Sequence, residues 1–68
     1  MEEFIEYARI YIHDIDADLE ELENHLSMNG YDFGIDKKRR VVFVFIDELS
    51  YVETILEDRE IDYSIRVY

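Results

Sequence analysis

The chain has 68 residues and a formal net charge of -11, with 18 acidic residues against 7 basic ones. This length allows a single domain over residues 1–68, and an apolar content of 49% is too high for a disordered chain. Cysteine is absent, which excludes disulfides, thiolate catalysis and cysteine-bound zinc. The apolar runs are shorter than a membrane span of ~20 residues, and the acidic start is unlike a signal peptide. We therefore expect a cytoplasmic protein.

The first part of the chain predicts a strand followed by a helix. Residues 7–13 place apolar side chains at every second position, which is typical of a half-buried strand. Asp16 or Asp18 can cap the helix that follows, and Asp18 with Glu21 has the spacing of a capping box. Gly30 stands where a left-handed helix end is expected. The apolar stripe of this helix consists of Leu19, Leu22 and Leu26.

The second part predicts two further strands around a hairpin, another helix and a fourth strand. Residues 31–36 alternate, and a polar turn at 36–39 leads into 41–46. This wholly apolar run, as a strand, either has cover on both faces or leaves one apolar face exposed. We expect Asp47 to cap the second helix, and residues 61–68 to form the last strand. The stripe of the second helix consists of Leu49, Val52, Ile55 and Leu56.

An internal repeat supports this order of elements. A shift of 30 residues superimposes the two helix stripes, and it places residues 31–35 on residues 61–65. Two strand-helix-strand units joined by a hairpin resemble the ferredoxin-like fold, an α+β fold with the order βαββαβ. This resemblance implies a four-stranded antiparallel sheet with two helices on one face, and with the first and third strands at its centre.

The face of the sheet away from the helices has no third layer to cover it. Strand alternation places five large apolar or aromatic side chains there, and exposed patches of this kind are typical of interaction sites. The sequence therefore also allows a structural or regulatory homodimer joined through this face. The residues expected at this interface are Tyr7, Tyr11, Val41, Phe43 and Phe45.

Two strands resemble those of RNA-recognition-motif domains, which share the ferredoxin-like fold. Residues 10–15 (IYIHDI) are similar to the first-strand motif, and residues 39–45 to the third-strand motif. Arg40 replaces the glycine and Val41 replaces an aromatic residue of that motif. The resemblance implies RNA stacked on the open face. Because phosphate contacts dominate such binding, the charge of -11 opposes it, and we do not expect direct binding to nucleic acid.

One residue suggests an alternative enzymatic role. The small CRISPR-adaptation nucleases and their toxin relatives carry an aspartate at the end of the first strand, and Asp14 stands at the similar position. The resemblance implies a metal held between two copies of Asp14, where it would activate water. Asp14, Asp16 and Asp18 also begin like a calcium loop, but the glycine and glutamate that such a loop requires later are missing. We therefore expect no enzyme, and no catalytic residue, cofactor or metal ligand.

The acidic residues give the strongest functional indication. They crowd the two helices and their starts, and those at a helix C-terminus oppose the helix dipole. In size and acidity the chain is similar to phage inhibitors of the anti-CRISPR or DNA-mimic type. This resemblance implies a module that occupies a basic, nucleic-acid-binding surface of a host protein in the host cytoplasm. The residues expected to bind this partner are Asp14, Asp16, Asp18, Glu20, Glu21, Glu23, Asp47, Glu48, Glu53, Glu57 and Asp58.

Overall fold

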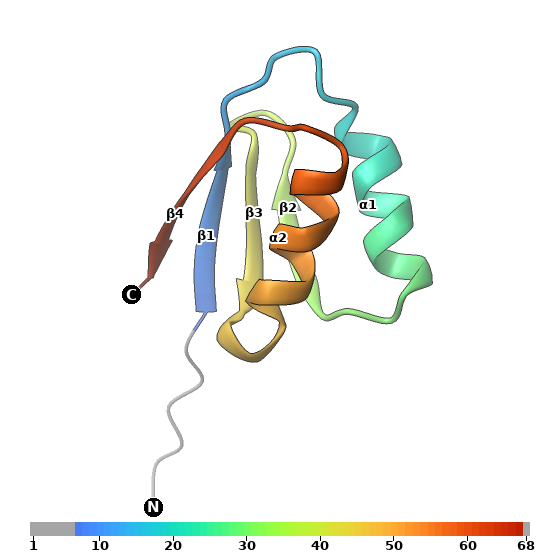
Figure 1. The fold of residues 1–68 in the computed structure, drawn as a ribbon, viewed down its shortest axis with the longest axis vertical. Helices are drawn as coiled ribbons and strands as arrows, with labels where there is room; N and C mark the ends of the chain where they lie inside the picture. Colours follow the sequence, from blue (N-terminus) through green and yellow to red (C-terminus); the bar gives the residue numbers. More distant parts are fainter. Residues whose placement is uncertain (1–6, 68) are drawn as a thin grey trace, which may run out of the picture.

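The computed structural model describes residues 7–67, which form a four-stranded antiparallel sheet and two helices in an α+β arrangement (Figure 1). The predicted order of strands and helices is confirmed for these residues. The elements are β1 (Tyr7–Ile12), α1 (Leu19–Met28), β2 (Phe33–Asp36), β3 (Val41–Phe45), a 3-10 turn (Ile46–Glu48), α2 (Leu49–Asp58) and β4 (Tyr63–Val67).

The sheet has the strand order β2-β3-β1-β4. Its two central strands are β1 and β3, as predicted from the sequence. Ile10 in the middle of β1 lies opposite Val42 of β3 on one side and Ile65 of β4 on the other. Only the β2–β3 pair comes from a local hairpin, so β1 depends on partners that are distant in the sequence.

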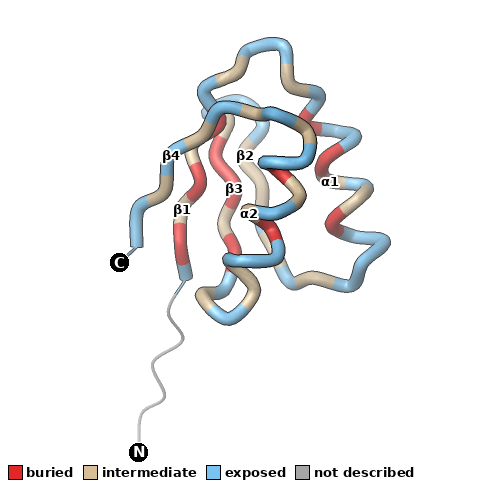
Figure 2. The backbone as a smooth tube through the Cα atoms, viewed as in Figure 1, coloured by how far each residue is buried: buried red, intermediate tan, exposed pale blue. Residues whose placement is uncertain are grey.

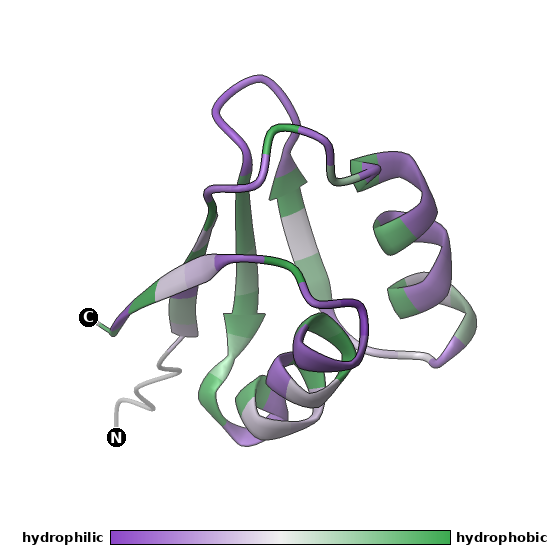
Figure 3. Cartoon of the chain, turned by 45° about the horizontal axis from the view of Figure 1, so that its top comes forward, coloured by the Kyte–Doolittle hydropathy of each residue, from purple (hydrophilic) through white to green (hydrophobic). Residues whose placement is uncertain are grey.

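Both helices pack on the same face of the sheet and close one hydrophobic core (Figure 2). The predicted leucine stripe of α1 is buried, and so are Val52 and Leu56 of α2. Figure 3 shows apolar residues along β3 and polar ones on the outer sides of the helices and in the loops. The buried core consists of Ala8, Ile10, Ile12, Leu19, Leu22, Leu26, Val42, Val44, Val52 and Leu56.

The two helices end in the same way, which confirms the 30-residue repeat. Each helix is ten residues long, and each is followed by a residue with left-handed backbone, Gly30 at φ +77° and Glu60 at φ +57°. Glycine adopts this conformation freely, whereas a glutamate adopts it at some cost. The next N–H then bonds back to a helix carbonyl, from Tyr31 to Leu26 at 3.3 Å and from Ile61 to Leu56 at 3.0 Å.

These helix ends explain why β2 and β4 begin later than expected. Residues 31–32 and 61–62 belong to the chain reversal after each helix, and the strands begin at Phe33 and Tyr63. The predicted end of the fourth strand at Tyr68 lies outside the described residues.

The start of α2 also differs from the prediction. The apolar run ends as a strand at Phe45, and Ile46 begins a 3-10 turn that leads into the helix. Asp47 lies within this turn and does not cap α2, whose N-cap position is taken by Glu48 without a side-chain hydrogen bond. The backbone of Glu48 is helical, with φ -103° and ψ -1°, whereas a capping residue is usually extended.

Candidate partner-binding surfaces

Most of the acidic residues predicted to bind a partner gather at one end of the molecule, which we call the upper edge. It consists of loops 13–18 and 59–62, the first turn of α1 and the last turn of α2 (Figure 1). Asp47 and Glu48 lie at the opposite end of α2, which spans about 15 Å as a ten-residue helix. The predicted residues therefore form two separate groups, and one flat partner surface would not contact both groups to the same extent.

Arg40 fixes the loop of the upper edge to the sheet. This half-buried residue has left-handed backbone with φ +61°, and its carbonyl accepts the Ile12 N–H at 2.9 Å. Its guanidinium donates to the carbonyl of Asp14 and, at 3.2 Å, to that of Ala17. Arg40 directly follows the predicted polar turn at 36–39, and its contacts hold loop 13–18 in place.

Two acids of the upper edge stabilise α1 and its contact with the end of α2. Asp18 caps α1 as predicted, because its Oδ1 accepts the N–H groups of Glu20 and Glu21 at 3.1 Å. The Glu21 carboxylate does not complete the capping box. It binds Arg59 instead, with distances of 3.1 Å to Nε and 2.6 Å to Nη2. The hydrogen bond from Arg59 lowers the pKa of Glu21.

Other predicted acids are also used within the fold. Glu23 forms an ion pair with Lys37 at 2.8 Å, and this hydrogen bond raises the pKa of Lys37. The Glu48 carboxylate accepts the backbone N–H of Asp32 at 3.2 Å. The Asp14 carboxylate accepts the N–H of Asp16 at 3.0 Å, which closes a turn within the loop.

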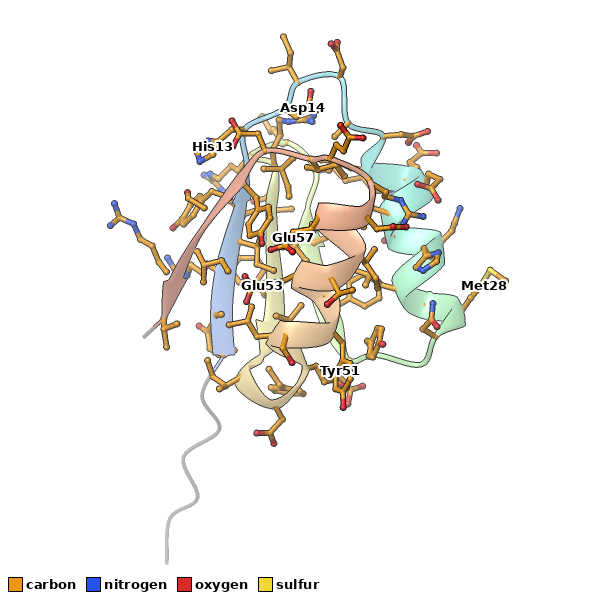
Figure 4. All side chains as sticks on the ribbon, in the orientation of Figure 1. His13, Asp14, Met28, Tyr51, Glu53 and Glu57 are labelled. Atoms are coloured by element: carbon orange, nitrogen blue, oxygen red, sulfur yellow. The ribbon has the colours of Figure 1, made fainter. Side chains whose placement is uncertain are left out.

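Glu53 and Glu57, which are labelled in Figure 4, share one hydrogen-bond donor from the sheet. They lie one turn apart on the side of α2 that faces β4, and the Tyr63 hydroxyl is 3.0 Å from a carboxylate oxygen of each. A phenol has a single proton, so it donates to one of the two at a time. Burial raises the pKa of Tyr63, and the two carboxylates raise it further because they favour the neutral phenol.

Five exposed carboxylates of the upper edge keep their negative charge available. Their side chains make no hydrogen bond or ion pair with any residue between 7 and 67. Of the four lysines and arginines at residues 37–40, only Lys38 has a side chain without such a contact in this part of the chain. Three of the five carboxylates are within the predicted set, and the other two, which follow α2 in the chain, were not predicted. The five residues are Asp16, Glu20, Asp58, Glu60 and Asp62.

The open face of the sheet carries a network of aromatic and cationic side chains. The rings of Tyr7 and Phe43 meet edge to face with centroids 6.2 Å apart. The Arg9 guanidinium lies 5.8 Å from the centroid of Phe43, a cation–π contact. Phe43 and Tyr11 are half-buried, because these long side chains cover much of the face themselves.

The prediction that Val41 lies exposed on this face is wrong, since only 7% of it is exposed. Val41 is paired across the sheet with Tyr11 on one side and with Asp36 on the other. Its short side chain lies between these larger neighbours, which shield it from solvent. The two most exposed of the predicted face residues are Tyr7 at 40% and Phe45 at 36%.

A shallow groove of about 680 Å³ runs over this end of the open face. Gly34 lies opposite Phe43 in the register, and a β-carbon at Gly34 would be 3.7 Å from the Phe43 ring. The missing side chain therefore leaves space beside that ring. The groove is lined by Tyr7, Asp32, Phe33, Gly34, Phe43, Val44 and Phe45.

Comparison with protein-family models, with curated proteins and with solved structures finds no match for this chain. Between residues 7 and 67, no three histidines, cysteines or acidic residues come together in a way that could hold a metal ion. In the same part of the chain, neither helix has the length and apolar character needed to cross a bilayer.

Proposed function

We propose that the protein is an acidic binding module that occupies a basic, nucleic-acid-binding surface of a larger protein, as inhibitors of the anti-CRISPR or DNA-mimic type do. The observation that carries this proposal is the set of five exposed carboxylates at the upper edge that form no side-chain hydrogen bond or ion pair within residues 7–67. They are part of a net charge of -11 over the whole chain, and such a field attracts basic surfaces and repels nucleic acid.

The way the fold uses its other acids supports this assignment. Arg40 and Arg59, which could neutralise the upper edge, are committed to loop carbonyls and to Glu21. Asp58 lies at the C-terminal end of α2, where the helix dipole disfavours an anion. A carboxylate kept at an unfavourable position suggests that the charge itself is useful.

We also infer that the fold belongs to the ferredoxin-like class. The central position of β1 and β3, the antiparallel pairing of all neighbours and the helix packing on one face support this inference. If the protein is a phage or mobile-element inhibitor, it acts in the cytoplasm of the host, where its basic partner binds nucleic acid.

The test is a competition experiment. The full chain is used to capture its partner from cells of the source organism, and the purified partner is then loaded with a fluorescent nucleic acid. We expect the chain to displace the nucleic acid, and the displacement to weaken as salt increases. A ternary complex of chain, partner and nucleic acid would contradict the proposal, and so would displacement that salt does not change.

The carboxylates are best tested with a pair of variants that change net charge equally. Asp16→Asn with Asp58→Asn removes two unpaired charges from the upper edge. Asp47→Asn with Glu48→Gln removes two charges at the other end of α2, and the new glutamine amide would keep an oxygen to accept the Asp32 N–H. We expect the first pair to weaken displacement and the second to change it much less. Equal effects would mean that only total charge matters.

A further inference from the structure

The groove on the open sheet face combines aromatic walls with negative charge. Tyr7, Phe43 and Phe45 contribute rings, and the edge-to-face contact of the first two sets two ring planes at 66° to each other. Asp32 lines the same groove, and its backbone N–H is bound by the Glu48 carboxylate. Rings at an angle to each other, with a carboxylate beside them, can stabilise an organic cation that leaves water.

We propose that this groove binds an arginine side chain of the basic partner. A guanidinium is flat, weakly hydrated and able to stack on rings, whereas a lysine ammonium holds its water more strongly. The aliphatic part of the arginine would lie over Gly34, where no side chain fills the space, and its charge would lie toward Asp32. This inference rests on the proposed function for its partner, and it adds a second contact on the face of the sheet opposite the helices.

The protein already contains one contact of this kind. The Arg9 guanidinium carbon lies 5.8 Å from the centroid of the Phe43 ring. This ring therefore already binds a guanidinium on the side toward the centre of the sheet. Arg9 comes from the middle of β1, whereas Asp32 precedes β2 at the edge of the sheet. Arg9 therefore directs an incoming cation away from the sheet centre and toward the end lined by Asp32.

The charge of the chain argues against a second copy as the occupant. Each copy has a net charge of -11, so two copies brought together repel each other at low salt. A cationic partner gains from the same field. The apolar area open at the centre of the face is also reduced, because Val41 is buried and Phe43 is half-buried.

The experiment is an NMR titration of the full chain with the capped peptide acetyl-Gly-Arg-Gly-amide, observed at the aromatic signals of Tyr7, Phe43 and Phe45. The matched probes replace arginine by lysine or by neutral citrulline. We expect the arginine peptide to shift these signals most and the citrulline peptide least. An exposed cation–π contact corresponds to about a two- to fivefold change in affinity, so Phe45→Leu should weaken binding by about that factor.

The repeat provides a matched control for the carboxylate. Asp62 is equivalent to Asp32 by the 30-residue shift and is also exposed, but it does not line the groove. Asp32→Asn should weaken binding of the arginine peptide, and Asp62→Asn should have a smaller effect. Equal effects of these variants, or equal shifts with citrulline, would overturn the proposal. Groove signals that change with protein concentration alone would also overturn it and assign the groove to a second copy.

Both variants keep the core intact, and the dispersion of the amide signals reports whether each is folded. The outcome is independent of the displacement experiment. A groove that fails to bind arginine leaves the acidic upper edge untouched, whereas a partner that binds nucleic acid and the chain together contradicts the proposed function but not the arginine site.

Discussion

The two halves of the molecule share their helices but use their acidic residues differently. α1 and α2 have the same length, pack into the same core and are each followed by a residue with left-handed backbone, 30 positions apart. In the first half, a capped helix follows a loop that Arg40 holds in place. In the second half, a 3-10 turn starts the helix without a cap, and two glutamates of the helix bind the Tyr63 hydroxyl.

This difference shows which carboxylates belong to the fold. Four of the six acids inside the two helices bind a partner, either a basic residue or the Tyr63 hydroxyl. The acids left without one are in the connecting segments and at the helix ends, where Asp16 and Asp62 are examples. Charge can vary there without disturbing the core, so these positions are suited to recognition.

The largest expected effects test whether the two halves of the core contribute equally to the free energy of unfolding. Leu26 and Leu56 occupy equivalent positions and are both fully buried. Leu26→Ala and Leu56→Ala should each lower the free energy of unfolding by about 2–5 kcal/mol, which can unfold much of so small a protein. Met28→Ala, at a position that is 87% exposed, is the control with little effect. Urea unfolding would measure all three, and a clearly smaller cost in one half would break the equivalence.

Arg40→Ala tests the feature that distinguishes the first half. It removes charge-assisted hydrogen bonds to the carbonyls of Asp14 and Ala17, so we expect a loss of about 1.5–3 kcal/mol in unfolding free energy. Arg39→Ala is the control, since Arg39 is an exposed residue whose ion pair with Asp36 contributes little. Similar unfolding midpoints for the two variants would mean that loop 13–18 is not held by Arg40.

Tyr63→Phe tests the feature that distinguishes the second half. At pH 7 the lost hydrogen bond should cost about 0.5–1.5 kcal/mol. The raised pKa of Tyr63 means that the folded protein keeps the phenol proton after the unfolded chain has lost it, near pH 10. Stability from this group is therefore complete below pH 10 and falls as the pH rises above it.

Denaturant unfolding at pH 9 and pH 11 would measure this effect. The wild type should lose more stability over this interval than Tyr63→Phe does. Lys37, whose pKa is also raised, contributes to the loss in both proteins. Equal losses in the two proteins would show that Tyr63 does not hold its proton more tightly when folded.

The smallest expected effects concern the two helix ends. Glu60→Gly should stabilise the protein by about 0.5–1 kcal/mol, because glycine suits the left-handed conformation that Glu60 adopts. Gly30→Ala should destabilise it by a similar amount, since φ there is +77° and the surrounding space is otherwise open. Thermal unfolding would measure both variants, and we expect the melting temperature to rise for Glu60→Gly and to fall for Gly30→Ala.

The local patterns of the sequence predicted the elements and their order. Alternation in residues 7–13, the helix stripes and Gly30 were sufficient, because these signals act over a few neighbouring residues. The strand order was reached through the repeat and a fold resemblance. Boundaries were less accurate where helix ends continue into the next loop, as at residues 31–32 and 61–62.

The contacts that shape the candidate site could not be predicted in the same way. Arg40 and Asp14 are 26 residues apart, and Arg59 and Glu21 are 38 apart, so no periodicity links them. Sequence reasoning could count the acids but could not tell which of them the fold neutralises. The burial of Val41 likewise depends on its cross-strand neighbours rather than on its own position in the alternation.

The central claim is that the unpaired acids of the upper edge bind a basic partner. Its most direct measurement is the association rate constant between the chain and the captured partner, at salt concentrations from low to physiological. We expect Asp16→Asn with Asp58→Asn to lower this rate on the order of threefold at low salt, and less as salt increases. Asp47→Asn with Glu48→Gln should lower it much less. Equal rates for the two pairs, or a rate that salt does not change, would contradict the claim.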